Sequence, residues 1–131
     1  MPSEIDQECL YAENHEWIRV DHGEATIGIS DYAQEELTDI VYVELPAEGD
    51  TFDQGEVFGV VESVKAASDV YLPVAGEIIE VNASLEDAPE LVNLDPYGDG
   101  WFVRIKIADE SQLDALMNPD DYERFVEAEE S

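Results

Sequence analysis

Short β-strand patterns separated by turn signals fill most of this chain. The clearest run is residues 101–107, whose odd-numbered residues are all apolar and are predicted to face one way, while Phe102, Arg104 and Lys106 face the other. Other strand-like runs lie at residues 15–20, 25–29, 41–45, 56–62, 70–73 and 77–82. Because turn residues end these runs, the sequence predicts a mainly β protein, built as a compact barrel or sandwich with helices at its edges.

Helical patterns are few and short. Ser30 or Asp31 can begin a helix that runs to about Asp39, directly after the first predicted hairpin. Two more short helices are expected over about residues 111–127, while residues 83–100 are predicted to be mostly loop. No linker or repeat divides the chain, so we expect a single domain over residues 1–131, with a core at about residues 10–108.

The chain carries an extreme negative charge. It has 34 Asp and Glu against 5 Lys and Arg, a formal net charge of −29, yet 44% of its 131 residues are apolar. Self-repulsion on this scale destabilises a compact state in dilute buffer, whereas molar salt shortens the Debye length to about 3 Å. We therefore expect a folded protein adapted to the salt-rich cytoplasm of a halophilic prokaryote. A DNA mimic or a cation buffer is the alternative, and direct nucleic-acid binding is not expected because phosphate contacts require cations.

The sequence also points to a compartment. Cys9 is the single cysteine, so an intramolecular disulfide is impossible and a reducing, cytoplasmic setting is expected. No stretch approaches the roughly 20 apolar residues of a membrane span. Residues 1–7 are acidic and lack the basic start of a signal peptide, so neither secretion nor a membrane partner is expected.

Signatures of catalysis or metal binding are weak. Residues 95–100 resemble the start of a calcium loop, but the position that needs a bidentate Glu is Lys106. His15 and His22 have no cysteine partners at zinc-site spacing, and there is no Gly-x-Ser-x-Gly nucleophile motif. The pair Gly98 and Gly100 flanks an acid, which would repel a phosphate. We therefore expect neither an enzyme nor a metal site.

One lysine stands out in this acidic composition. Lys65 is one of two lysines in the chain, and strand-like apolar residues flank the small residues around it, which places it near the tip of a predicted hairpin. A solvated turn lysine is the ordinary interpretation. A lysine that protrudes from a rigid scaffold can also be a handle for covalent modification, with the chemistry left to the attached cofactor.

Several ordered blocks of sequence resemble one known family. Residues 58–70 and 73–82 resemble the lipoyl-attachment region of glycine cleavage system H proteins. The first of these blocks contains the segment Glu62-Ser63-Val64-Lys65. Further blocks that resemble the same family are residues 11–17, 25–34, 41–46 and 95–101. The resemblance runs in order from about residue 10 to residue 127.

The resemblance implies a fold, a cofactor and a function. The fold would be a lipoyl/biotinyl-type barrel-sandwich hybrid, with a short helix after the first hairpin and short C-terminal helices. Lipoic acid would be amide-linked to Lys65. Its arm would take an aminomethyl group from glycine decarboxylase, pass it to the tetrahydrofolate-dependent aminomethyltransferase, and be reoxidised by dihydrolipoamide dehydrogenase. The protein, expected to be a monomer, would be a carrier and a substrate of these enzymes rather than a catalyst.

Further site residues follow from the same resemblance. Asn14, Glu16 and Asp69 would line a cleft that shelters the loaded arm, and an acid near the amine end of the arm is electrostatically favourable. The family often has serine at the position of Asn14. Asp69 could in addition cap the turn after Lys65. Glu62 and Ser63 would help the lipoylating enzyme to recognise the hairpin.

Three other functions fit a lysine presented in this way. A biotin carrier shares the scaffold, but biotinyl lysines usually sit between two methionines, and here the neighbours are Val64 and Ala66. An H-like protein could act mainly as a relay scaffold that holds octanoyl or lipoyl groups for transfer to other enzymes. Alternatively, Lys65 could stay unmodified in an acidic protein that is not a carrier.

Overall fold

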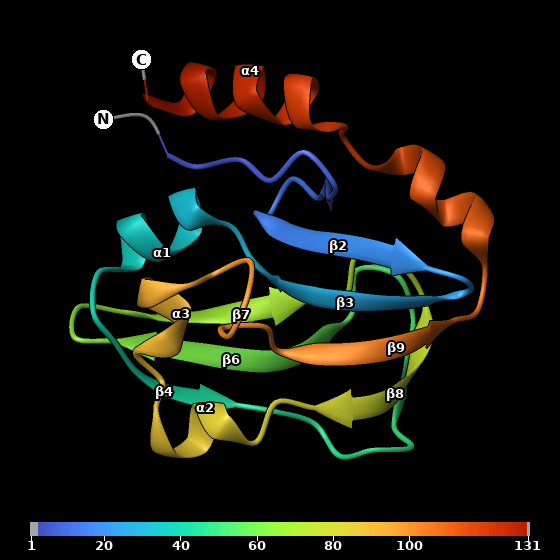
Figure 1. Ribbon diagram of the computed structural model, residues 1–131, viewed down its shortest axis with the longest axis horizontal. Helices are drawn as coiled ribbons and strands as arrows, with labels where there is room; N and C mark the ends of the chain where they lie inside the picture. Colours follow the sequence, from blue (N-terminus) through green and yellow to red (C-terminus); the bar gives the residue numbers. More distant parts are fainter. Residues whose placement is uncertain (1–2, 131) are drawn as a thin grey trace.

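Two antiparallel sheets form the body of the molecule (Figure 1), in a computed structural model that describes residues 3–130. The larger sheet has the strand order β1-β2-β3-β9-β8-β5 and the smaller one the order β4-β6-β7. Their bounds are β1 (Leu10–Tyr11), β2 (Glu16–Asp21), β3 (Glu24–Ile29), β4 (Ile40–Glu44), β5 (Thr51–Phe52), β6 (Val57–Ser63), β7 (Ala67–Tyr71), β8 (Gly76–Val81) and β9 (Val103–Ile107). The prediction of a mainly β barrel-sandwich fold is confirmed. Strands β1 and β5 were not predicted, because two residues are too few to show a period.

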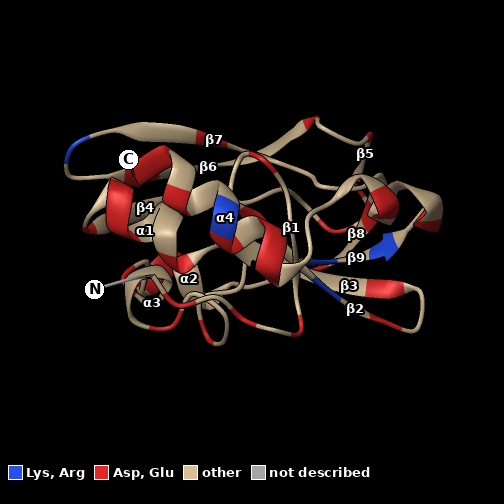
Figure 2. Cartoon of the chain, turned by 90° about the horizontal axis from the view of Figure 1, so that it is seen from above, with Lys and Arg blue, Asp and Glu red and all other residues tan. Residues whose placement is uncertain are grey.

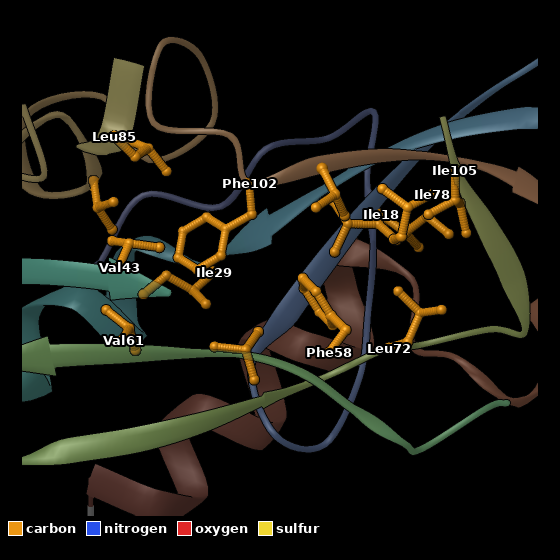
Figure 3. Packing of buried hydrophobic residues seen from close by; sticks show 14 of the residues in the cluster. Ile18, Ile29, Val43, Phe58, Val61, Leu72, Ile78, Leu85, Phe102 and Ile105 are labelled. Carbon is orange, nitrogen blue, oxygen red and sulfur yellow. The ribbon is translucent and has the colours of Figure 1, made fainter. Parts of the chain in front are cut away.

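The core lies between the two sheets. Figure 3 shows Ile18, Ile78 and Ile105 of the larger sheet on one side and Val43 and Val61 of the smaller sheet on the other. All of these side chains are at most 3% exposed. Burying an aliphatic side chain of this size contributes about 1.5–3 kcal/mol to stability, so this layer supplies the main attraction between the sheets.

One orientation predicted from the alternating pattern is wrong. Phe102 was expected to face away from the apolar side of its strand, but its side chain is 0% exposed and lies in the core. The regular strand β9 begins only at Val103, although the Phe102 amide already donates a hydrogen bond to the Ile27 carbonyl. Trp101 packs instead against the second apolar cluster, around Tyr11 and Trp17. A strict period of two therefore does not extend to residues 101 and 102.

The first predicted helix is present. Helix α1 (Asp31–Leu37) follows the β2–β3 hairpin, and its N-cap is Ser30, whose hydroxyl oxygen accepts a hydrogen bond from the Ala33 amide at 3.2 Å. Asp31 lies inside the first turn, where its carboxylate accepts a hydrogen bond from the Gln34 side chain. Of the two candidates for the cap, Ser30 is therefore the one used.

The segment 83–100, predicted as mostly loop, contains two short helices, α2 (Ser84–Asp87) and α3 (Leu91–Leu94). Each buries one apolar side chain completely, Leu85 from α2 and Val92 from α3. Asn93 links α3 to the connection between α1 and β4, because its side chain accepts a hydrogen bond from the Ile40 amide and donates one to the Thr38 carbonyl, both at 2.9 Å. One-turn helices like these lack the length that makes a helical period visible.

The chain closes with a 3₁₀ helix (Glu110–Ala115) and helix α4 (Pro119–Glu130). Helix α4 packs through Tyr122 and Val126, and the Tyr122 ring stacks on Tyr11 with centroids 4.2 Å apart. The Tyr122 hydroxyl also lies 2.6 Å from the Ser30 hydroxyl, which joins α4 to the start of α1. Within residues 3–130, no helix is both long and apolar enough to cross a membrane.

Acidic residues, red in Figure 2, are distributed over many of the helices, strands and loops. Among the described residues, Glu16 is the one charged residue whose side chain is buried. Arg19, Arg104 and Arg124 each pair with a carboxylate within 4.0 Å. With so few cations, mutual repulsion between the acids is opposed mainly by the apolar core and by dissolved salt.

We expect the free energy of unfolding to rise between about 0.1 M and 1 M KCl and to level off above that range. The reason is that the screening length falls from about 10 Å to about 3 Å over this interval. Urea unfolding followed by circular dichroism at each salt concentration measures the effect. A sucrose series is the control, because sucrose strengthens apolar burial without screening charge. A free energy of unfolding that does not respond to KCl would contradict the expectation.

Candidate functional site

The β6–β7 hairpin presents Lys65 at its tip. The strands pair with Val61 opposite Ser68 and Glu62 opposite Ala67, and residues 64–66 connect them. Lys65 is the one basic residue in the connection between β6 and β7. Figure 2 shows the corresponding blue segment at the far end of this hairpin. Residues 64–69 are all exposed, so the lysine projects into solvent.

Ser63 organises the turn. Its amide donates to the Ala66 carbonyl at 2.7 Å, and its hydroxyl oxygen accepts hydrogen bonds from the amides of Ala66 and Lys65 at 3.1 and 3.3 Å. One side chain thus fixes both backbone ends of the connection that carries the lysine, as Ser hydroxyls do in tight turns.

The hairpin is anchored to the rest of the protein on the side of β6. The Val64 amide donates to the Asp39 carbonyl at 3.0 Å, and β6 pairs with β4 along its other edge. Gly59 lies where the register with β7 shifts, and a Cβ atom there would be 2.6 Å from the Glu44 carbonyl oxygen. Val61 and Val70, each 1% exposed, hold the hairpin on the core. The tip is therefore exposed but held in a fixed geometry.

The Lys65 ammonium has no carboxylate within 4.0 Å among residues 3–130, although the chain is rich in acids. The same holds for Lys106 on β9, the other lysine. The two differ in position, because Lys106 lies within a sheet strand, whereas Lys65 stands at the end of a hairpin. Only Lys65 is placed so that a second protein can surround it.

A cleft of about 240 Å³ lies at the other end of β7. Its walls come from the segment before β2, the end of β7 and the region after the 3₁₀ helix, and include Asn14, Glu16, Tyr71, Pro73, Leu116 and Met117. The cleft therefore combines apolar side chains with two carboxyl and two amide side chains, those of Glu13, Glu16, Asn14 and Gln54. Such a mixture suits a ligand with an apolar stem and a polar end.

Glu16 is the unusual group in this cleft. It is only 1% exposed, and its Oε2 accepts a hydrogen bond from the Tyr71 amide at 3.1 Å. Its Oε1 is also buried and has no hydrogen-bond partner among the described residues. Burial raises the pKa of Glu16 from its ordinary value of 4.5 to about 7, although the backbone amides near it oppose the shift. A buried carboxyl with one unpartnered oxygen can accept a polar group from a ligand.

The structure brings some of the predicted site residues together and separates others. Asn14 and Glu16 line the cleft, whereas Asp69 is not among its lining residues and lies on the exposed strand β7, between Lys65 and Tyr71. Ser63 makes the hydrogen bonds that organise the turn, so Asp69 is not the cap of this turn. Glu62 lies beside Ser63 and, within the smaller sheet, pairs with Ala67 on β7 and Tyr42 on β4.

Two contributions to the site were not predicted from the sequence. The Tyr71 amide fixes the Glu16 carboxyl, and the Asp39 carbonyl anchors the hairpin tip. Both are backbone groups: every residue type provides a carbonyl, and every type except proline an amide N–H, so no pattern of side chains could have indicated them.

Known proteins resemble this chain closely. The model of the glycine cleavage H-protein family matches residues 9–129. A glycine cleavage system H protein from Marinobacter nauticus is 55% identical over 129 residues, which is 98% of this chain and 99% of that protein. The glycine cleavage system H protein of Carboxydothermus hydrogenoformans is 50% identical over 127 residues, or 97% and 98% of the two chains. A crystal structure of a glycine cleavage system H protein from Mycobacterium marinum matches with a TM-score of 0.80 at 35% identity, over 90% of this chain and 95% of that chain.

The family model spans nearly all of the strands and helices described above, and the solved structure has the same two-sheet fold. The chain therefore belongs to the glycine cleavage H-protein family, the lipoyl carriers of the glycine cleavage system, which work with the other components of that system and are not themselves catalysts.

Proposed function

We propose that Lys65 is the lysine that carries the lipoyl group. The observation that supports this assignment is its position, at the exposed tip of a hairpin whose turn is fixed by Ser63 and whose strands are held by the core. In the modification step, the neutral Nζ attacks the activated carboxyl carbon of lipoate. The N–C amide bond forms, the bond from that carbon to the oxygen of its leaving group breaks, and the amine loses a proton.

The loaded arm then serves three enzymes in turn. When attached to Lys65, the lipoyl group would carry an aminomethyl group from glycine decarboxylase to the tetrahydrofolate-dependent aminomethyltransferase, and dihydrolipoamide dehydrogenase would then reoxidise it. The carrier itself works as a monomer in the cytoplasm, a reducing compartment that suits its unpaired Cys9.

The cleft at the end of β7 shelters the loaded arm. From the Lys65 Cα to the amine nitrogen of the loaded arm there are about sixteen covalent bonds, so the arm would reach about 19 Å, because an extended chain advances about 1.2 Å per bond. At about 3.3 Å per residue, β7 covers about 13 Å from Lys65 to Asp69 and about 20 Å to Tyr71. An arm that lies along β7 therefore passes Asp69 and ends at the mouth of the cleft.

Glu16 receives the amine end of the arm. Its unpartnered Oε1 is the available acceptor, and Asn14 lines the same side of the cleft. A cation that arrives beside this carboxyl favours its ionised form and lowers its pKa. Glu16 therefore holds its proton more firmly in the empty cleft than in the occupied one, and docking of the aminomethyl arm releases a proton near neutral pH. Asp69 adds a second negative charge along the path of the arm.

One prediction concerns the modification of Lys65. After incubation with lipoate, ATP and a lipoate ligase, the intact mass of the wild type should increase by one lipoyl group. The variant Lys65→Arg should not change, because guanidinium remains protonated and is not a nucleophile at neutral pH. Lys106→Arg removes the other lysine and should still be modified. Modification of Lys65→Arg, or loss of modification in Lys106→Arg, would assign the lipoyl group to another residue.

Another prediction concerns the pH dependence of the free energy of unfolding. Between pH 4.5 and about 7 the folded state keeps a proton on Glu16 that the unfolded state has lost, so the contribution of this group to the free energy of unfolding falls as pH rises through that window. Glu16→Gln keeps an acceptor for the Tyr71 amide and has no proton to lose. The free energy of unfolding of Glu16→Gln minus that of the wild type should therefore rise by up to about 3 kcal/mol from pH 5 to pH 8.

Urea unfolding in molar KCl at several pH values measures this difference. Glu13→Gln is the matched control, because Glu13 lines the same cleft but is exposed, and its substitution removes the same charge. The control should follow the pH profile of the wild type. Parallel profiles for Glu16→Gln and the wild type would mean that Glu16 is ionised in the empty cleft.

A further inference from the structure

Exposed apolar side chains gather around the hairpin tip. Within residues 3–130 the exposed large hydrophobic residues are Val20, Val41, Tyr42, Val57, Val64 and Leu94. The most exposed of them are Val41 at 52%, Tyr42 at 50%, Val64 at 66% and Leu94 at 75%, whereas Val20 and Val57 are below 40%. We call the first four residues the tip patch.

Hydrogen bonds hold the segments of the tip patch together. The Val64 amide donates to the Asp39 carbonyl at 3.0 Å, which brings the hairpin tip to the start of β4. The next amide, that of Ile40, donates to the Asn93 side chain at 2.9 Å, which brings the end of α3 to the same place. Figure 1 shows the β6–β7 connection, the start of β4 and α3 at the same end of the molecule. The tip patch therefore lies at the end that carries Lys65.

A β-bulge contributes to this exposure. The register between β4 and β6 shifts between Ile40 and Tyr42, so the usual alternation fails and both Val41 and Tyr42 are exposed. Bulges re-aim side chains and are common beside functional sites. Acidic residues border the patch, because Asp39 precedes β4 and Glu62 pairs with Tyr42. An apolar centre with a polar border is the usual anatomy of a protein–protein interface.

We propose that the tip patch is the docking surface for the lipoylating enzyme, the acyltransferase that forms the amide at Lys65. The inference rests on the assignment of Lys65 as the modified lysine. The Nζ atom is about 6 Å from the Cα, at about 1.2 Å per bond, so the acyl-binding site of this enzyme must come into contact with the hairpin tip. A standard interface covers about 800 Å² on each partner, which is far more than one turn can offer. The segments next to the tip are those that form the patch.

The same reasoning distinguishes this enzyme from the others. Enzymes that act on the distal end of the loaded arm work about 19 Å from the Lys65 backbone and can dock elsewhere. The lipoylating enzyme has no arm to reach, because it acts on the bare lysine. Apolar contact also suits a carrier with a net charge of −29, because it attracts a partner without any opposite charge and at any salt concentration.

The test compares lipoylation kinetics of variants with a purified lipoate ligase, ATP and lipoate. Tyr42→Thr, Leu94→Gln and the double variant remove apolar surface from the patch at sites that are at least half exposed, where substitutions usually change stability by less than about 0.5 kcal/mol. Aromatic residues are frequent hot spots, so Tyr42→Thr should raise the KM for the carrier about tenfold with kcat unchanged. Val20→Thr and Val57→Thr are the matched controls, since they remove exposed apolar residues outside the patch, and they should behave as the wild type.

The outcomes separate the two proposals. If the wild type is not modified at Lys65, the assignment of the lysine fails, and the docking surface fails with it. If the wild type is modified but both single variants, shown to be folded by circular dichroism, keep its kcat/KM, the docking surface alone is overturned. A loss of glycine-dependent exchange with glycine decarboxylase, without a loss of lipoylation, would assign the patch to that enzyme and also overturn the proposal.

Discussion

The apolar layer between the six-stranded and the three-stranded sheet opposes the repulsion of a surface with a net charge of −29. Its members come from both sheets, and Phe102, Leu85 and Val92 extend it into the segments beside them. Strand β6 is central to the smaller sheet and contributes Val61 to this layer, so the packing of the core also fixes the direction of the β6–β7 hairpin. The position of Lys65 at the tip is thus a consequence of core packing as well as of the local turn.

The sequence predicted those parts that depend on repeated side-chain patterns. The hairpin around Lys65, the helix after the first hairpin and the short C-terminal helices all follow from alternation, capping residues and helical spacing. The prediction from the sequence was wrong where a tertiary contact overrides the pattern. Phe102 is an example, because it lies just before the strand begins and its side chain packs into the core. The prediction was also wrong for α2 and α3, which are too short to have a period and are stabilised by packing and by Asn93.

The candidate site shows the same division. Its lysine could be proposed from the sequence because an unusual residue type stands in a recognisable setting, whereas the environment of Glu16 could not be predicted. A glutamate at the start of a strand is normally solvated, and its burial here depends on segments far away in the sequence, namely β7 and the region after the 3₁₀ helix. Backbone partners such as the Tyr71 amide leave no mark in the sequence. The raised pKa of Glu16 is therefore a property of the tertiary structure alone.

The arrangement of these features along one hairpin also explains how a carrier can serve several enzymes. The lysine and the tip patch lie at one end of β7, and the cleft with Glu16 lies at the other. On the proposals made above, an enzyme bound at the tip would leave the cleft uncovered, and an arm sheltered in the cleft would leave the tip patch free. The apolar part of this end is limited to the four exposed side chains of the tip patch, which favours short-lived complexes. A mobile substrate requires short-lived complexes, because it must leave one enzyme before it can reach the next.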